Sequence, residues 1–307
     1  MRYDVIVVGG SFAGLSAAQA LARARRRVLV IDGGMPRNRF AAAAHNIFGH
    51  DGTPPAQLFA HGRAELARYP TAELLAAQVA TATADAAGVL VTLDDGSTRS
   101  GRRLVLATGL RDTLPDVSGV AARWGATVLH CPYCHGYEVA GRALGVLANH
   151  PGAAHHALML PDWGPTTYFT QGRFPPDADT AAQLAARGVT IEHTPIVALL
   201  GEAPALDGVR LADGRVVAIA AVFMIPASHQ ASPLAAQLGC AFDDGPLGAH
   251  VRVDAMKRTT VPGVYAAGDA ASPMHSATAA IAAGVLAGVG AHQSLVAEAA
   301  GAGRRVA

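Results

Sequence analysis

The chain has 307 residues, and 24 Lys and Arg against 23 Asp and Glu give a formal net charge of +1. This balance does not indicate binding to nucleic acid or to an acidic membrane surface. With 51% hydrophobic and 15% charged residues, the composition is that of a compact globular protein with room for two domains. The 3 cysteines are too few for a secreted disulfide scaffold, and no targeting or membrane-spanning segment is recognisable. We expect a soluble, cytoplasmic protein.

The N-terminus has the pattern of a strand, a glycine-rich turn, a helix and a second strand. Residues 3–8 are apolar and β-branched, GGSFAG follows at 9–14, and LSAAQALARA has helical composition and period. The second apolar run, 27–32, ends in Asp32. This order is typical of a dinucleotide-binding βαβ unit, although such a pattern standing alone also occurs as a simple strand–helix packing turn.

Each residue of this unit has an expected role. Gly9 makes the tight turn out of the strand, and Gly14 lets the helix pack closely on the sheet. The helix N-terminus, beside Gly10 and Ser11, offers N–H groups to a pyrophosphate. Asp32 is placed to accept hydrogen bonds from a ribose. Ser11 stands where the GxGxxG pattern has its middle glycine, and it is the smallest change that still lets a phosphate approach the backbone.

Two later strands end in similar turns. RRLVLATGL (102–110) is an apolar strand, and TTVPGVYAAGDA (259–270) is a strand that precedes a long helical stretch. The turn residues of interest are Thr108, Gly109, Gly268 and Asp269. Together with the N-terminal unit, these turns favour a dinucleotide site over a packing turn.

HCPYCH, at 130–135, contains two of the three cysteines. A zinc site needs about four ligands, usually in two separated pairs, and no second pair follows, so we expect no metal. A structural disulfide is rare in the cytoplasm, and so short a loop would restrict the unfolded chain little. A redox pair remains, either of the kind that glutaredoxins carry near the start of a small domain or one coupled to a cofactor.

In this order, the N-terminal turn, the Ala-Thr-Gly turn, the CxxC and GVYAAGDA resemble the motifs of low-molecular-weight thioredoxin reductases over essentially the whole chain. The resemblance implies an α/β fold with two Rossmann-like three-layer domains and a homodimer. An FAD-binding domain would comprise residues 1–114 and 228–307. An inserted domain, 115–227, would resemble a nicotinamide-binding domain and carry the cysteine pair, which would then be coupled to the flavin.

The same resemblance implies which residues hold FAD. They would be Gly9, Gly10, Ser11, Gly14, Asp32, Thr108, Gly109, Gly268, Asp269, Ser276 and Ala277. The helix that opens around 275–277 would point its positive end at the flavin, where it would stabilise the negative charge of the reduced form.

Roles for the cysteine pair also follow from the resemblance. Cys134 would face the flavin and Cys131 would exchange with substrate. His135 stands where thioredoxin reductases have an aspartate that acts in proton transfer, and an imidazole can do this near neutral pH, so His135 is the expected general acid/base. His130 is either functional or a satisfied residue at the end of a strand, and Cys240 is expected to be a small buried hydrophobe.

The inserted domain departs from the thioredoxin reductase pattern. Where NADPH-dependent members have a second glycine-rich turn, this chain has Ala148, Asn149 and His150. Where they have a basic pair for the 2′-phosphate, it has Thr170, Gln171 and Gly172. Side chains in a pyrophosphate turn block close approach of the phosphate, and the missing cations remove the strongest phosphate contacts. We therefore expect no working NADPH site.

These features resemble the branch of dithiol oxidases that close disulfides in gliotoxin, holomycin and romidepsin. The resemblance implies an FAD enzyme that oxidises a small-molecule dithiol through Cys131 and Cys134 and passes the electrons to molecular oxygen, giving hydrogen peroxide. Two alternatives stay open: an NADPH-dependent thioredoxin reductase, and a flavin-dependent redox sensor that does not turn over repeatedly. His45, His50 and His275 are further candidates for the flavin or substrate site without an assigned role.

Overall fold

The computed structural model describes residues 2–303, and the chain forms two compact units. Unit 1 comprises the described parts of Met1–Arg39, Thr53–Arg111 and Ser228–Ala307, and unit 2 comprises Phe40–Gly52 and Asp112–Ala227. The strands β7 (Leu110–Thr113) and β16 (Ala227–Gln230), at the junctions between the units, pair with each other. The division from sequence placed residues 40–52 in the first domain, whereas in the structure they pack with unit 2. That the units are independent domains stays a prediction.

Unit 1 is built on a seven-stranded sheet of order β3-β2-β1-β6-β5-β4, with β19 added to β6. Its strands are β1 (Arg2–Val8), β2 (Val28–Asp32), β3 (Ala72–Ala76), β4 (Val79–Asp85), β5 (Gly88–Leu93), β6 (Thr98–Leu106) and β19 (Val264–Ala266). The strands β3, β2, β1, β6 and β19 run parallel, with Val5 opposite Val28 on one side and Arg103 on the other. Their carboxyl ends therefore lie along one edge of the sheet.

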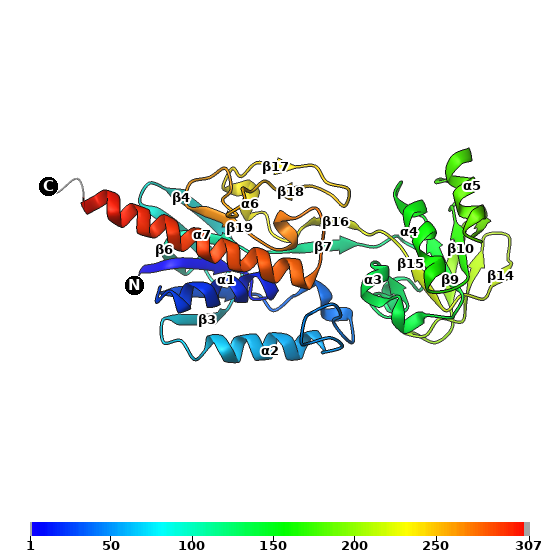
Figure 1. Cartoon of the computed structure of the whole chain (residues 1–307), viewed down its shortest axis with the longest axis horizontal. Coiled ribbons are helices and arrows are strands. Elements are labelled where there is room, and N and C mark those ends of the chain that lie inside the picture. Colours follow the sequence, from blue (N-terminus) through cyan, green and yellow to red (C-terminus); the bar gives the residue numbers. More distant parts are fainter. Residues whose placement is uncertain (1, 304–307) are drawn as a thin grey trace. The chain divides into compact units, whose positions relative to one another are not determined.

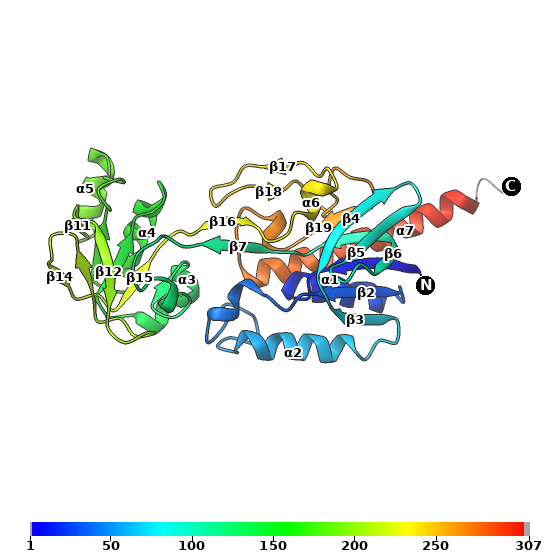
Figure 2. The same ribbon diagram turned by 180° about the vertical axis from the view of Figure 1, so that it is seen from behind.

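Two layers cover this sheet because side chains alternate along each strand. Val5 and Val7 pack with α1 (Phe12–Arg23), α2 (Pro55–Leu66) and α7 (Ala277–Gly303). Ile6 and Val8 face the opposite way, toward the segment with α6 (Leu234–Gln237), β17 (Phe242–Asp243) and β18 (His250–Val251). Figures 1 and 2 show the two faces of this unit from opposite sides. Cys240 is buried in the second core, as expected.

Helix α7 is the one described helix whose length and composition would allow it to cross a membrane. Its glycines indicate that part of its apolar surface packs inside unit 1. A Cβ on Gly284 would lie 2.1 Å from the Ala13 carbonyl oxygen, and one on Gly288 would lie 2.6 Å from that of Ala17. These glycines allow α7 to lie directly on α1, where Ala287 joins the core of unit 1.

Unit 2 has a five-stranded parallel sheet of order β11-β10-β9-β15-β8. Its strands are β8 (Val128–Leu129), β9 (Leu144–Leu147), β10 (Thr166–Phe169), β11 (Thr190–Glu192) and β15 (Ala221–Phe223). One face packs on α4 (Ala153–Met159) and α5 (Ala178–Ala186). The other packs on a small antiparallel sheet of β12 (Ile196–Leu200), β13 (Gly208–Leu211) and β14 (Val216–Val217). The predicted fold of two Rossmann-like three-layer parts is confirmed.

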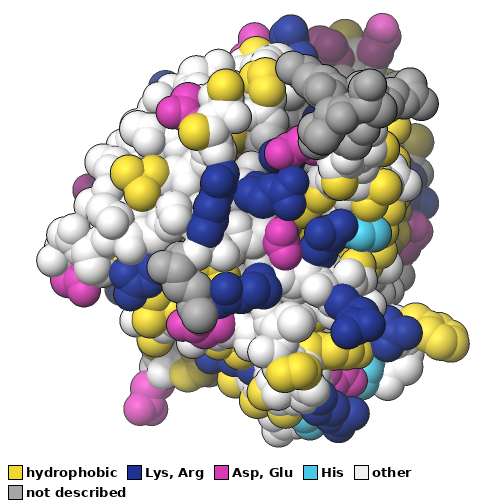
Figure 3. Space-filling view, turned by 90° about the vertical axis from the view of Figure 1, so that its left-hand side faces the viewer, with side chains coloured by type: hydrophobic (Ala, Val, Ile, Leu, Met, Phe, Trp, Pro, Cys, Tyr) yellow, Lys and Arg dark blue, Asp and Glu magenta, His cyan; other side chains and the backbone are white. Residues whose placement is uncertain are grey.

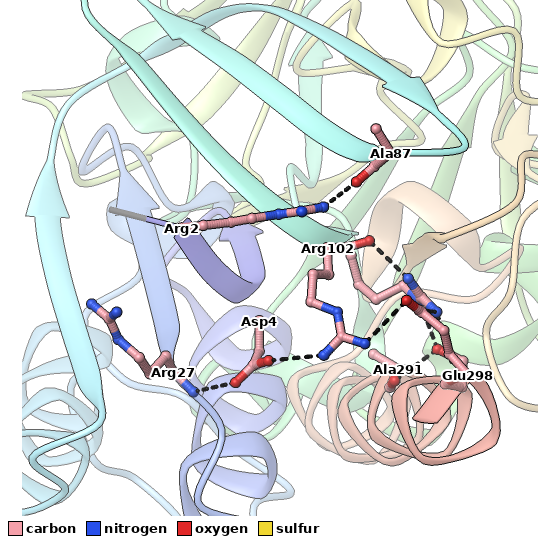
Figure 4. A network of polar contacts seen from close by, with 9 residues as sticks. Arg2, Asp4, Arg27, Ala87, Arg102, Ala291 and Glu298 are labelled. Carbon is pink, nitrogen blue, oxygen red and sulfur yellow. Dashed lines mark hydrogen bonds and ion pairs between the residues drawn. The ribbon is translucent and has the colours of Figure 1, made fainter. Parts of the chain in front are cut away.

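Arginines gather at the end of unit 1 that carries the described chain ends, interspersed with acidic side chains (Figure 3). Arg102 lies between two carboxylates, 3.4 Å from an Asp4 oxygen and 3.1 Å from a Glu298 oxygen (Figure 4). Arg103 pairs with the same Glu298 at 2.7 Å, and the Arg27 backbone N–H donates to Asp4 at 3.0 Å. This network ties β1, β6, α7 and the residue before β2 together.

Candidate functional site

The carboxyl edge of the unit 1 sheet brings together the residues that were expected to hold a dinucleotide. Gly9 follows β1, Asp32 ends β2, Thr108 and Gly109 follow β6, and Gly268 follows β19. These strands neighbour one another in the parallel part of the sheet. Ligands of Rossmann-type sheets bind along this edge, so the arrangement fits a dinucleotide.

The turn after β1 accepts only glycine at two positions. Gly9 has φ +106, a conformation that L side chains rarely adopt, and its Cβ would lie 2.2 Å from the Ala107 carbonyl oxygen. A Cβ on Gly14 would lie 1.8 Å from the Gly9 carbonyl oxygen. The backbones of the turn, the helix and the sheet therefore lie in direct contact with one another. A pyrophosphate-binding turn requires this close approach.

Asp32 is already engaged in hydrogen bonds to the turn. Its Oδ1 accepts from the Gly10 N–H at 3.1 Å and from the Gly34 N–H at 3.2 Å, and its Oδ2 pairs with Arg63 of α2. Ser11 is the N-cap of α1, and its side chain makes no capping hydrogen bond. The first N–H groups of a helix have no intrahelical acceptor. In α1 these N–H groups belong to the residues that directly follow Ser11. The pair with Arg63 was not foreseen from sequence.

The turns after β6 and β19 complete this edge. Gly109 has φ +69, and a Cβ there would meet nothing within 4 Å. Gly268 has φ +76, and its Cβ would lie 2.9 Å from the Cβ of Ala13 in the first turn of α1. Gly268 therefore brings Asp269 to the start of α1. Ser276 begins α7 by accepting a hydrogen bond from the Ala279 N–H at 3.1 Å, so Ala277 is the first residue of this helix.

Arg37, which the sequence analysis did not single out, joins three segments at this edge. It donates to Asp269 Oδ2 at 3.0 Å, to His275 Nδ1 at 2.8 Å and to Ser228 Oγ at 3.1 Å. Because a guanidinium can only donate, His275 Nδ1 must be the acceptor and the ring proton lies on Nε2. His275 is thereby placed beside Asp269, while no sequence motif marks Arg37.

In unit 2, Cys131 and Cys134 form a disulfide with a Cα–Cα distance of 5.2 Å. Cys131 is the N-cap of α3 (Pro132–His135), and Pro132 is its first residue, where a missing N–H costs nothing. The N–H groups of Cys134 and His135 both donate to the Cys131 carbonyl, at 3.1 and 3.2 Å. Both cysteines are half-buried, and Tyr133 between them is exposed. The pair is thus held in a short turn at the surface of unit 2.

His135 directly follows this turn and is half-buried. Burial lowers its pKa, the Glu138 carboxylate raises it, and His45 lowers it. A largely neutral imidazole beside Cys134 can accept a thiol proton. His50, on the same segment as His45, has an exposed side chain. The structure thus brings His45 toward His135.

His130 lies at the end of β8, and its Nδ1 donates to the Met224 carbonyl at 3.2 Å. Its ring stands edge-on to that of His156, with 5.7 Å between the centroids. The His156 side chain is buried, and its Nδ1 has no hydrogen-bond partner among the described residues. Burial, helped by His130, His155 and His150, lowers the pKa of His156 to about 4.

This histidine predicts how stability depends on pH. The folded-state pKa of His156, about 4, lies below the ordinary 6.5, so the unfolded chain binds the proton first as pH falls. The stability that the buried neutral His156 contributes is fully present above pH 6.5. It is lost as the pH falls from there to pH 4, by up to about 3 kcal/mol. We expect His156→Gln to flatten this part of the profile in urea unfolding curves. A profile unchanged by the substitution would contradict the assignment.

The carboxyl edge of the unit 2 sheet is occupied by side chains of its own turns. At the switch point between β9 and β15, the Asn149 amide donates to the Ile225 carbonyl at 2.6 Å and accepts from the Ile225 N–H at 3.2 Å. After β10, the Gln171 amide accepts from the Ile196 N–H at 2.7 Å and donates to the Ile196 carbonyl at 3.2 Å. Two amide side chains therefore bond to backbone groups at the edge where such folds bind a dinucleotide.

Comparison with known proteins identifies the family. The model of the pyridine nucleotide-disulphide oxidoreductase family matches residues 3–143 and 174–284. Thioredoxin reductase tcpT of Claviceps purpurea is 33% identical over 96% of this chain and 95% of its own, and thioredoxin reductase sirT of Leptosphaeria maculans is 32% identical over 94% and 93%.

Solved structures agree with this result. An oxidoreductase from Agrobacterium tumefaciens is 46% identical with a TM-score of 0.92, covering 96% of this chain and 99% of its own. HlmI is 38% identical with a TM-score of 0.93, covering 99% and 96%. The chain belongs to the pyridine nucleotide-disulphide oxidoreductase family. Within it, the chain is a thioredoxin-reductase-like oxidoreductase with a flavoprotein-type Rossmann fold.

Proposed function

We propose that this oxidoreductase is an FAD-dependent dithiol oxidase. It forms a disulfide in a small-molecule dithiol through Cys131 and Cys134, passes the electrons to molecular oxygen and does not use NADPH. The observation that carries this proposal is the Asn149–Ile225 pair at the carboxyl edge of unit 2, where a glycine-rich turn would be needed for a nicotinamide dinucleotide. The match to the pyridine nucleotide-disulphide oxidoreductase family supports the disulfide-exchanging part of the proposal.

The residues of unit 1 fit FAD. Gly9, Gly14 and the start of α1 would receive the pyrophosphate, Asp32 the ribose, and Asp269 with the start of α7 the flavin end. The remaining proposed contacts are Gly10, Ser11, Thr108, Gly109, Gly268, Ser276 and Ala277. A bound FAD would supply a two-electron acceptor for the cysteine pair and a reductant for oxygen, with hydrogen peroxide as the product.

The chain's own residues perform the thiol chemistry by exchange. A substrate thiolate attacks Cys131, breaking the Cys131–Cys134 bond and forming a mixed disulfide, and Cys134 leaves as a thiolate. The second substrate thiol then attacks the substrate sulfur of that mixed bond, so the product leaves with its disulfide and Cys131 is released as a thiolate. His135 takes up and returns protons beside Cys134. Each cycle moves two electrons and two protons out of the substrate.

The surface around the disulfide suits a small apolar substrate. Tyr133 and Tyr137 are 69% and 85% exposed, and Phe48 of the neighbouring segment is fully exposed. The Tyr133 ring stands edge-on to that of Trp163 at 5.7 Å. Exposed aromatic side chains mark binding surfaces.

A homodimer and a cytoplasmic location are expected and stay predictions.

An NADPH-dependent thioredoxin reductase is the second candidate, because relatives with about one third identity bear that name. In that case the disulfide would be reduced through the flavin by a nicotinamide. The two candidates differ in the direction of electron flow. A redox sensor would oxidise one equivalent of dithiol and stop.

Aerobic turnover tests the proposal. The purified protein is expected to hold one FAD per chain and, with a simple dithiol in air, to form disulfide and hydrogen peroxide in equal amounts over many cycles without nicotinamide. The measurement combines an oxygen electrode with a thiol assay. Oxidation that ends after one equivalent per chain would contradict the oxidase and favour the sensor.

A further inference from the structure

The segment Phe40–Gly52 belongs to the same unit as the redox turn (Cys131–His135), although it lies far from that turn in sequence. The Asn46 side chain donates to the Tyr133 carbonyl at 2.8 Å, and this carbonyl belongs to the residue before Cys134. His45 Nε2 lies 3.2 Å from Glu138 Oε1, in the turn after His135. The segment therefore holds the chain within and just behind the disulfide loop.

The segment is itself closed by internal contacts that fix these two side chains. Asn46 has φ +60, a left-handed conformation that asparagine tolerates better than most residues. Its N–H donates to Asp51 Oδ1 at 2.8 Å, and the Gly52 N–H donates to the Ala44 carbonyl at 3.0 Å. Asn46 is thus presented toward Tyr133 by a compact loop.

His45 lies between two carboxylates. Nε2 faces Glu138, and Nδ1 lies 3.4 Å from Asp51 Oδ2, while the imidazole is 19% exposed. An imidazolium satisfies this arrangement by donating to both oxygens, whereas a neutral ring can donate to one only. His45 therefore bridges the Asp51 and Glu138 carboxylates and holds the Glu138 carboxylate near His135.

We propose that His45 and Asn46 are positioning residues for the redox turn. Asn46 fixes the peptide between the two cysteines, and His45 holds the Glu138 carboxylate and sets how strongly its charge acts on His135. The role in catalysis rests on the dithiol oxidase function proposed above. The positioning itself is a property of the oxidised protein and can be tested without turnover.

The test is the titration of His135 followed by NMR in oxidised holoenzyme with ¹³C-labelled histidine. The charged groups that act on His135 are Glu138 and His45. In His45→Gln the interaction by which His45 lowers the pKa of His135 is lost and Glu138 loses its imidazole partner, so the pKa of His135 should rise. In Glu138→Gln the carboxylate is lost, so the pKa of His135 should fall. These opposite shifts are not expected from general loosening of the loop.

Asn46→Gly keeps the left-handed backbone and removes the donor to Tyr133. We expect reduction of the flavin by dithiol to slow about 10-fold, since misplaced reacting groups cost rate, with FAD content and melting temperature unchanged. His50→Gln is the matched control, because this histidine is on the same segment with its side chain exposed. Equal rates in Asn46→Gly and His50→Gln, or shifts of His135 in one common direction, would overturn the proposal.

Discussion

Replacing Cys134 by serine is expected to abolish reduction of the flavin by a dithiol and to leave Cys131 able to trap the substrate. With Cys134 missing, Cys131 has no disulfide partner and electrons have no path from the turn. A mixed disulfide with Cys131 should appear as added mass on the intact protein after incubation with a monothiol analogue and a mild added oxidant, because a monothiol has no second thiol to release it. Cys131→Ser should retain FAD and fail to form this adduct. Turnover should be lost in both variants.

Two further variants sharpen this result. Cys240→Ala is the matched control, since this third cysteine lies in the core of unit 1 at 6% exposure and should leave turnover unchanged. His135→Ala should keep the disulfide chemistry and lose rate on the order of 10²-fold, the usual contribution of an acid/base group. Trapping by Cys134 in Cys131→Ser would reverse the assignment of the two thiols. An unchanged rate in His135→Ala would make that histidine structural.

NADPH is expected to bind with little affinity. The 2′-phosphate would lose two charge-assisted contacts at about 1.5–3 kcal/mol each, which weakens binding by roughly 10²- to 10⁴-fold. The Asn149 and Gln171 amides hydrogen-bonded to Ile225 and Ile196 add obstruction. Isothermal titration calorimetry of the holoenzyme should show no saturable binding at the NADPH concentrations of a cell. Binding in the micromolar range would contradict this prediction.

The fold and much of the unit 1 site could be predicted because local rules determine them. Gly9 and Gly14 are required where a strand, a turn and a helix meet, so their spacing is visible in sequence. Asp32 ends β2, and Gly268 and Asp269 follow β19, and the apolar runs of these strands are equally plain. The parallel sheet then brings these ends to one edge. The CxxC was visible for the same reason, as two cysteines one helical turn apart.

The remaining features depend on contacts between distant residues. Arg37 meets Asp269 across 232 positions and His275 across 238. Asn149 meets Ile225 across 76 positions, so the sequence showed the missing glycines and not the hydrogen bond between these two residues. Residues 40–52 carry no motif, and their packing on α3 depends on Asn46 reaching Tyr133, 87 positions away. Single-sequence patterns contain no information about such pairs.

Anaerobic stopped-flow reduction of the holoenzyme tests the central claim most directly. In one experiment the holoenzyme is mixed with a small-molecule dithiol, and in a second it is mixed with NADPH. Reduction by dithionite is the control that shows that the flavin can be reduced. The account predicts that the dithiol bleaches the flavin absorbance rapidly, that NADPH leaves it unchanged over the same time, and that admitting air restores it with one hydrogen peroxide per flavin. Rapid, saturable bleaching by NADPH would contradict the account and make the protein a nicotinamide-dependent reductase.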